Sequence, residues 1–363
     1  MSRIAILSPS LANGDAVTND VFGMADVLKQ RGHDVRLFCE SHAVDNGRVF
    51  NVTRLRSFLS GRDDILIYHF SHGWRPALDL LATLGCRKVI KYHNITPAHF
   101  FHGFSRSDVE LCETGRQQLA EVIRGGRCDL FLSASAFNMS ELIALGAAAE
   151  KNFVVPPFHR IDRLANLSVD DRVVAKYSDG KTNVLAVSRV APHKGHLSLL
   201  ESFAQFHFNC NRNSRLLVVG KGGEGLSRYS RLLHRATEML GLRDAVIFTG
   251  GVSEEALKAF YKVADVFVTT SEHEGFCVPL VEAMSMELPI AAYASCAIPE
   301  TLGDAGVAWE DRDPFLLAET LDVITSDATI RSEFAARALR RYREEFTEAA
   351  IEKSFLNALS SVQ

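Results

Sequence analysis

The segment 271–284 holds two carboxylates at a spacing that suits a hydroxyl-rich ligand. It follows an apolar run, Val266–Thr270, so its turn lies at the carboxyl end of a predicted parallel strand, where ligands bind in open α/β sheets. Pro279 suits the first turn of a following helix, whose outward amides attract an anion. Glu274 on the turn and Glu282 on the helix wall can both accept hydrogen bonds from sugar hydroxyls. The alternative is that Glu274 caps the helix and Glu282 is solvated.

The same segment carries a family resemblance. Glu274-Gly275-Phe276-x-x-Pro279-x-x-Glu282-Ala283 resembles the E-x7-E signature of the retaining glycosyltransferases of family 4, which have the GT-B fold. The resemblance covers nearly the whole chain, because four further landmarks follow in the family's order: Asn13-Gly14, Tyr92-His93-Asn94, Ser188-Arg189-x4-Lys194-Gly195 and Phe248-Thr249-Gly250-Gly251-Val252-Ser253. The E-x7-E block together with the Arg/Lys pair is the specific part of the match.

The resemblance implies a role for each matched residue. Glu282 is expected to hold the nucleotide ribose, and Glu274, with the amides that follow it, the sugar hydroxyls. His93 is expected to hydrogen-bond a donor-sugar hydroxyl or to lie at the reacting centre. The remaining donor-binding residues are expected in the glycine turn at Gly14, in the base-binding loop at Val252, and in the turn Gly275, Phe276, Cys277 and Val278.

Arg189 and Lys194 also have a physical argument. Negative charge develops on the departing diphosphate, and fixed cations in a dry cleft stabilise that charge more in the transition state than in the ground state. Arginine offers a bidentate fork and lysine a compact charge, so the pair can hold two phosphates. We therefore count Arg189 and Lys194, with His93 and Glu274, as candidate catalytic residues, and expect neither a metal ion nor a cofactor.

Two positions depart from the family pattern. Family members often carry two glycines near position 14, whereas Gly14 here is flanked by Asn13 and Asp15, and an aspartate beside a diphosphate is repulsive. Cys277 stands where the family commonly has glycine, so this turn must tolerate a β-carbon. Its thiol is expected to be buried and inert, the alternative being a position near the phosphates.

Two other motifs resemble ligand sites of different classes. Residues 220–225 form a literal G-x-G-x-x-G, but the next predicted strand ends in Gly250-Gly251 and not in the acidic residue that a dinucleotide site needs. These glycines therefore predict a turn. Asp311-Arg312-Asp313 resembles the D-x-D metal motif of the other major glycosyltransferase fold. Because Asp313-Pro314 suits an N-cap followed by a first-turn proline, we expect a helix cap there.

These residues must be positioned by a regular alternation of strands and helices. Most of the apolar runs are continuous, as in strands covered on both faces, and amphipathic stretches separate them. This pattern predicts the doubly wound parallel α/β class. The expected strands are Ile4–Leu7, Asp34–Cys39, Ile65–His69, Lys88–His93, Leu130–Ser135, Phe153–Pro156, Val184–Ser188, Leu216–Gly220, Val246–Gly250, Val266–Ser271 and Pro289–Tyr293.

A polar stretch, 157–182, interrupts the alternation and predicts a linker between two α/β halves. With the family resemblance, we expect GT-B architecture: two facing Rossmann-like doubly wound domains with an interdomain cleft. Residues 1–165 are then the acceptor domain and 180–345 the nucleotide-sugar domain. The amphipathic tail 346–363 is expected to return to the first domain as a helix.

Composition excludes several classes of protein. The 363 residues are 47% hydrophobic and 23% charged, which is ordinary for a globular chain, and the net charge of −4 provides no field for nucleic acid. No apolar run suits a membrane-spanning helix, and the first one is too short for a signal-peptide core. The seven cysteines are scattered without metal-ligand spacing, which favours a reducing compartment. We expect a cytoplasmic protein with at most weak peripheral contact at the inner face of the membrane.

The function implied by the resemblance is retaining transfer of a hexose from a UDP- or GDP-linked donor. The expected acceptor is a hydroxyl of a glycan or lipid-linked glycan, as in cell-surface polysaccharide biosynthesis. Two alternatives use the same residues. A nucleotide-sugar 2-epimerase would convert the donor without an acceptor, and a non-catalytic subunit would bind the donor without turning it over. Oligomeric state, donor base, acceptor and linkage are not specified by the sequence.

Overall fold

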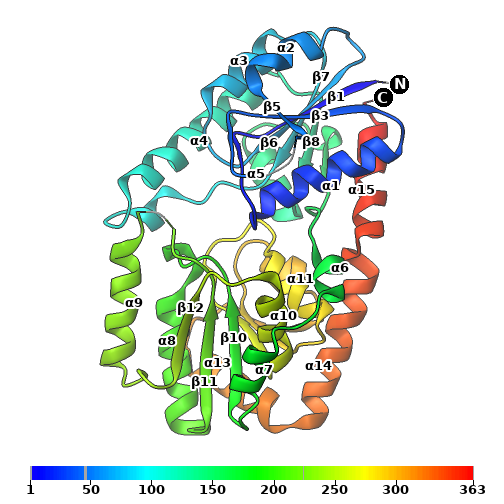
Figure 1. Cartoon of the computed structure of the whole chain (residues 1–363). Helices are drawn as coiled ribbons and strands as arrows, with labels where there is room; N and C mark the ends of the chain where they lie inside the picture. Colours follow the sequence, from blue (N-terminus) through cyan, green and yellow to red (C-terminus); the bar gives the residue numbers. More distant parts are fainter. Residues whose placement is uncertain (1, 45–46, 224, 363) are drawn as a thin grey trace. The chain divides into compact units, whose positions relative to one another are not determined.

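The computed structural model describes residues 2–44, 47–223 and 225–362. The chain divides into two compact units (Figure 1). The first comprises Met1–Ala98, Asp108–Arg160 and Glu348–Gln363, and the second comprises His99–Ser107 and Ile161–Thr347. The chain therefore leaves the first unit twice, once for the short segment 99–107 and once for the whole of 161–347.

The first unit is built on a seven-stranded parallel sheet in the order β5-β3-β1-β6-β7-β8-β9. The apolar runs make strands because both faces are covered; Ile4, Ala5, Ile6 and Leu7, for example, are all buried. The strands are β1 (Arg3–Leu7), β3 (Asp34–Cys39), β5 (Val49–Asn51), β6 (Ile65–Phe70), β7 (Arg87–Tyr92), β8 (Leu130–Ser133) and β9 (Asn152–Val154), with a separate parallel pair, β2 (Ser10–Leu11) and β4 (Ser41–His42).

Helices α1 (Ala16–Gln30) and α15 (Glu348–Ser360) lie side by side in this unit, although they come from opposite ends of the chain (Figure 1). Arg31, which follows α1, donates to Glu352 at 2.8 Å, and Phe355 packs edge-on against Phe158. Ile351, Phe355 and Leu359 belong to a buried cluster with β1 and α1. The other helices are α2 (Leu55–Phe58), α3 (Arg75–Thr83), α4 (Arg106–Arg124, its first two residues in the second unit) and α5 (Ala136–Ala144).

The second unit has a six-stranded parallel sheet in the order β12-β11-β10-β13-β14-β15. Numbered from its own first strand, this order is 3-2-1-4-5-6, the order of the Rossmann fold, with its reversal between β10 and β13. The strands are β10 (Thr182–Val187), β11 (Ser214–Val219), β12 (Val246–Gly250), β13 (Val266–Thr269), β14 (Ile290–Tyr293) and β15 (Gly306–Trp309).

Helices cover both faces of this second sheet (Figure 1). Helix α8 packs against α9 and α13, and α10 packs against α7. The helices are α6 (Ile161–Asn166), α7 (Asp171–Tyr177), α8 (His196–Gln205), α9 (Ser227–Met239), α10 (Glu254–Val263), α11 (Val278–Ser285), α12 (Ile298–Leu302), α13 (Pro314–Ser326) and α14 (Ala328–Arg341). Within the described residues, no helix combines the length and the apolar character needed to cross a membrane.

Every predicted strand is present within a few residues of its expected ends, and the parallel doubly wound class is confirmed. Sequence reasoning missed the very short strands β2, β4 and β5, and it missed β15, a run of four residues that begins with glycine and holds a single β-branched residue. The stretch 157–182 contains no complete strand, as expected, but it is not a plain linker. Asp170 caps α7 by accepting from the Arg172 amide at 3.0 Å, a local signal that the sequence contained.

Candidate functional site

In the second unit, the loops that follow β10 and β13 meet where the strand order reverses, which is the usual ligand position in such sheets. Gly195 fixes this meeting point. Its φ is +66°, and a Cβ there would lie 2.0 Å from the carbonyl oxygen of Thr270. The Thr270 hydroxyl donates to the Gly195 carbonyl at 2.9 Å. Glycine is needed both for the backbone conformation and for the close approach.

Lys194 and Glu274, each on one of these two loops, form an ion pair. The Lys194 Nζ donates to Glu274 Oε1 at 2.6 Å, and the two side chains are only 14% and 10% exposed. The backbone of Glu274 is fixed as well, because its carbonyl accepts from the Ala297 amide at 3.3 Å. Glu274 is not a helix cap: the residue at the cap position of α11 is Cys277. The structure thus brings together two of the predicted catalytic residues.

Arg189 lies on the same loop as Lys194 and is exposed. In the described part of the chain its guanidinium makes no hydrogen bond or ion pair, so its charge is available to an anionic ligand. Between the two cations the chain carries His193, which is buried against the rings of Phe100 and Phe101. Burial first, then Lys194 and Arg189, holds the pKa of His193 well below 6.5, so this imidazole is neutral. The local positive charge is that of Arg189 and Lys194.

Helix α11 begins in the predicted turn. Cys277 has φ +74°, a left-handed conformation that explains why glycine is common there in the family. Pro279 occupies the first turn, and the Phe276 carbonyl is held by the Thr301 hydroxyl at 2.9 Å. Burial raises the pKa of the Cys277 thiol well above 9.0, with Glu274 adding to it, so the thiol stays protonated. The turn from Gly275 to Val278 therefore presents the positive end of a helix beside a neutral thiol.

Glu282 is half-buried on α11 and has a protein partner. Its carboxylate accepts from the Tyr261 hydroxyl on α10 at 2.7 Å. Burial raises the pKa of Glu282 above 4.5, and the Tyr261 hydrogen bond opposes that rise. The side chain is held in one place by a single donor, which leaves other lone pairs for a ligand hydroxyl.

Two further loops at this edge of the sheet begin at glycines, Gly220 and Gly250, that adopt positive φ. At Gly220, φ is +143° and a Cβ would lie 1.9 Å from the Ser188 carbonyl oxygen, so the G-x-G-x-x-G motif makes a turn, as predicted; its Glu224 lies outside the described residues. The Gly220 amide donates to the Gly250 carbonyl at 3.0 Å, which places the next loop alongside. Val252, the predicted base-binding residue, is exposed on that loop.

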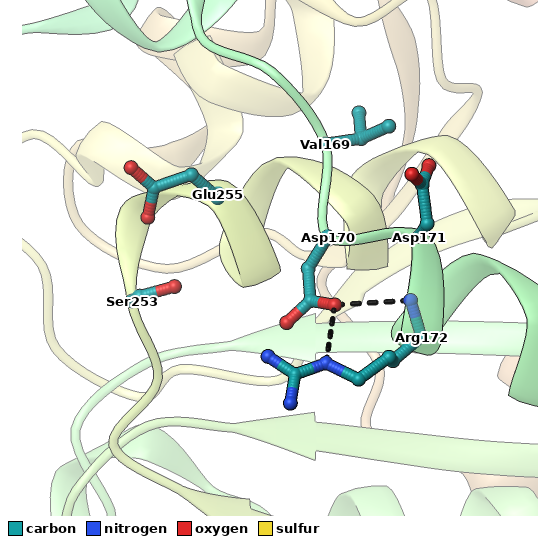
Figure 2. A pocket seen from close by; sticks show the side chains of 6 residues that line it. All are labelled: Val169, Asp170, Asp171, Arg172, Ser253 and Glu255. Atoms are coloured by element: carbon teal, nitrogen blue, oxygen red, sulfur yellow. Dashed lines mark hydrogen bonds and ion pairs between the residues drawn. The ribbon is translucent and has the colours of Figure 1, made fainter.

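A polar surface hollow of about 410 Å³ lies elsewhere on the second unit (Figure 2). Its polar groups already serve local structure: Asp170 caps α7 and pairs with Arg172, and Ser253 caps α10 by accepting from the Ala256 amide at 3.2 Å. The other lining residues are Val169, Asp171 and Glu255. Since no predicted site residue lines this hollow, we do not assign it to the donor.

In the first unit, Gly14 has φ +77° with open space where a side chain would begin. Asp15, whose charge would repel a diphosphate, is the N-cap of α1. Its carboxylate accepts from the Thr18 amide at 3.0 Å and from the Thr18 hydroxyl at 3.3 Å. The aspartate is therefore explained by the helix that follows the glycine turn.

His93 follows β7 and stacks on His69, the two ring centroids being 5.1 Å apart. His93 Nε2 lies 2.9 Å from His69 Nδ1 and 3.5 Å from Asp20 Oδ2. Burial, with the neighbouring His69 and Lys91, holds the pKa of His93 well below 6.5. Among the described residues, Asp20, His69 and His93 are the group whose ligand atoms lie close enough, within 4.8 Å, for a metal ion. The Lys91 ammonium, 3.8 Å from Asp20, already supplies a positive charge there.

The Asp311-Arg312-Asp313 motif is a helix start, as expected. Asp313 caps α13 by accepting from the Phe315 amide at 2.8 Å, and Pro314 follows in the first turn. Asp311 accepts from the Asp313 amide at 3.1 Å, and Arg312 pairs with Glu272. Each member of the motif thus has a structural partner.

Two parallel α/β units of this strand order define a GT-B-like protein, and comparison with solved structures agrees. The crystal structure of HepE from Anabaena in complex with UDP and glucose superposes with a TM-score of 0.77, at 19% identity, over 99% of this chain and 100% of that one. Residues 170–341 match the family described as glycosyl transferases group 1. This segment, nearly half of the chain, belongs to that family, and it contains the sites at Arg189, Lys194, Glu274 and Glu282.

Two curated relatives each match about half of the chain. Mannosylfructose-phosphate synthase of Agrobacterium fabrum is 29% identical over 178 residues, 47% of this chain and 38% of that protein. D-inositol 3-phosphate glycosyltransferase of Frankia alni is 30% identical over 186 residues, 49% of this chain and 46% of that protein. The chain thus spans less than half the length of these relatives.

The structure adds partners that sequence reasoning did not identify. Tyr261 holds Glu282, His193 lies between the two cations in the chain, and Asp20 and Lys91 lie beside His93. Tyr261 is the donor for the half-buried carboxylate of Glu282, but no sequence spacing links it to position 282. Lys91 gave a signal: it is a lysine inside an apolar strand, which indicates a buried partner.

Proposed function

We propose that this chain is a retaining glycosyltransferase that moves a hexose from a nucleoside-diphosphate sugar to a hydroxyl of a glycan or lipid-linked glycan. The observation that carries the proposal is the Lys194–Glu274 pair, buried at the strand-order reversal of a segment that belongs to the glycosyl transferases group 1. Exposed Arg189 and the start of α11 lie on the same two loops. The geometry suits a ligand with a diphosphate on one side and hydroxyls on the other.

Each residue has a defined task in this proposal. The Lys194 ammonium has three donors, of which Glu274 takes one, so the others can bind the diphosphate together with Arg189. Glu274 keeps a second oxygen for the sugar hydroxyls, and the amides of Gly275–Val278 add positive partial charge. Glu282, held by Tyr261, binds the ribose, and the backbone at Val252 meets the base. Gly14 is proposed to serve the phosphates and His93 the sugar.

With two cations for the leaving diphosphate, a divalent metal ion is not needed for charge neutralisation. We propose front-face substitution with retention, in which the leaving phosphate takes the proton of the acceptor hydroxyl. UDP is the first nucleotide to test, because the HepE structure was solved with UDP and glucose. GDP remains the alternative donor nucleotide. Cell-surface polysaccharide biosynthesis remains the process in which we propose that the chain acts.

A thermal-shift screen with UDP, GDP and ADP tests the donor first, because a ligand that binds only the folded chain raises the midpoint by mass action. The matching hexose donor is then incubated with the protein and a glycan or glycolipid extract. We expect nucleotide release that depends on the extract, together with a glycosylated product. Conversion of the donor to a second nucleotide sugar without any extract would identify an epimerase, and binding without turnover would identify a non-catalytic subunit.

A further inference from the structure

The first unit buries four ionisable side chains together, and the proposed function uses only His93. Asp20 reaches the group from α1, His69 and Lys91 from strands β6 and β7, and His93 from the end of β7. The side chains of Asp20, His69 and Lys91 are fully buried, and that of His93 is 9% exposed. Four such groups in one apolar place are costly unless they compensate one another.

The compensation centres on Asp20 Oδ2. This atom lies 3.8 Å from Lys91 Nζ, 3.8 Å from His69 Nδ1 and 3.5 Å from His93 Nε2. Among the described residues it has no hydrogen-bond partner, whereas Oδ1 accepts from the Phe158 amide at 2.8 Å. Lys91 Nζ instead donates to the Val155 carbonyl. The unpaired oxygen can therefore take a proton; the other buried atom of this group without a partner among the described residues is His69 Nε2.

The surroundings determine which group takes that proton. Burial raises the pKa of Asp20 from 3.8 to about 6, against the opposing effects of Lys91 and the Phe158 amide. Burial and the Lys91 charge hold the pKa of His69 and His93 well below 6.5. An imidazolium here would lie beside a buried ammonium, whereas a protonated carboxyl would not add a charge.

We propose that Asp20, His69 and Lys91 are positioning residues that hold His93 as a neutral imidazole in one ring orientation, with Asp20 and not a histidine taking the proton in mild acid. The inference deepens the proposed function, because it rests on His93 as a site residue. His93 Nε2 is engaged by His69 at 2.9 Å. The nitrogen left for a ligand hydroxyl is therefore Nδ1.

A divalent metal ion is the other occupant that three such atoms could accept. Lys91 disfavours it, because its ammonium is fully buried and faces the same carboxylate oxygen. The carboxylate already has its counter-charge, and a second cation at that oxygen would be repelled. The observations therefore favour a shared proton.

The test is a pH titration of the full chain labelled with ¹⁵N-histidine, followed by long-range ¹H–¹⁵N spectra between pH 5 and 7.5. His93→Gln assigns the His93 signals. We expect His93 to keep the pattern of a neutral ring throughout, with a small shift centred near pH 6 that disappears in Asp20→Asn. Asp26→Asn is the matched control: Asp26 lies on the same helix, is half exposed and pairs with Arg48, and this variant should keep the shift.

Conversion of His93 or His69 to the imidazolium at or above pH 6 would overturn the proposal, as would one bound equivalent of zinc in the purified protein. The wild-type titration decides the order of protonation even if Asp20→Asn fails to fold. These spectra need no substrate, so a failed transfer assay beside the expected titration would overturn only the proposed function.

The pH profile of kcat gives a readout that a purely structural role would not move. We expect wild-type kcat to be about tenfold lower at pH 5 than on its plateau, following one group with a pKa near 6. Asp20→Asn mimics the protonated carboxyl and should remain at the low level across the range. A folded Asp20→Asn that keeps both the plateau and the acid limb would overturn the positioning role.

Discussion

Removing the charge from Glu274 and from Glu282 should change different kinetic constants if the two carboxylates have the proposed roles. Glu274→Gln and Glu282→Gln keep the shape of the side chain, remove its charge and replace one acceptor oxygen by an NH2 donor. A lost hydrogen bond to a charged group is worth about 1.5–3 kcal/mol, which corresponds to roughly a ten- to hundredfold effect. The structure indicates on which constant each effect should fall.

Glu274 is paired with Lys194 at 2.6 Å in the chain without donor. Glu274→Gln therefore releases the ammonium of Lys194 for the diphosphate, so donor KM should not rise. What is lost is the charge that orients the sugar as the anomeric carbon reacts, and kcat should fall roughly ten- to hundredfold. Glu282 binds ribose in ground and transition states alike, so Glu282→Gln should mainly raise donor KM by a similar factor.

Tyr261→Phe is the matched control, because it removes the hydroxyl that holds Glu282 and leaves the carboxylate charged. Its effect on donor KM should have the same direction as that of Glu282→Gln and be smaller. Steady-state kinetics with varied donor and saturating acceptor measure both constants, after circular dichroism has shown that the variants are folded. Wild-type kinetics in both glutamine variants, or a Glu282→Gln effect confined to kcat, would refute the assigned roles.

Transfer activity should survive excess EDTA, because Arg189 and Lys194 serve the leaving diphosphate; loss with EDTA and recovery with Mn²⁺ would contradict this. Cys277 should resist alkylation at pH 8 in the folded chain and react after unfolding, as peptide mass spectrometry can show, because burial raises the pKa of its thiol well above 9.0. Gly195→Ala should lower the free energy of unfolding by about 2–4 kcal/mol, because it combines a left-handed backbone with a 2.0 Å clash. Gly180→Ala, at φ +82° in open space, is the control and should lower it by about 1 kcal/mol. Denaturant unfolding measures both. Asp20 binds its proton more tightly in the folded chain (pKa about 6) than in the unfolded chain (3.8), so its contribution to stability falls by about 2 kcal/mol as pH rises from 4 to 6. Denaturation of Asp20→Asn should lack this slope.

The strands and the donor-side residues were predictable because their signals are local. A continuous apolar run identifies a doubly covered strand without its neighbours, and the loops after β10 and β13 follow such runs directly. Once both strands are assigned to one parallel sheet, Lys194 and Glu274 must lie at the same edge. Their contact at 2.6 Å required the further fact that β10 and β13 are adjacent, which only the topology supplies.

Strand β15 and helix α7 show the opposite case, in which weak local signals mislead. The four residues Gly306–Trp309 are apolar, but the run is short, begins with glycine and holds a single β-branched residue, so its strand signal is weak. Helix α7 begins after a capping aspartate, Asp170, inside a polar stretch. Because the helix is mostly polar, this stretch predicts a linker. Pairing with β14 completes β15, and packing against α10 supports α7.

The group of buried ionisable residues around His93 could not be predicted from the sequence, for a different reason. His69, Lys91 and His93 were visible as polar residues on or beside apolar strands, but Asp20 lies on a helix 49 residues before the nearest of them. What joins them is that β6 and β7 pair in register, so that His69 faces Lys91, while α1 covers the same end of the sheet. A lysine inside an apolar strand predicts a buried counter-charge, but the sequence does not identify the residue that provides it. The packing of α1 on the sheet identifies Asp20 as that residue. It also leads to the inference that the carboxylate of Asp20, and not the histidine beside it, takes the proton.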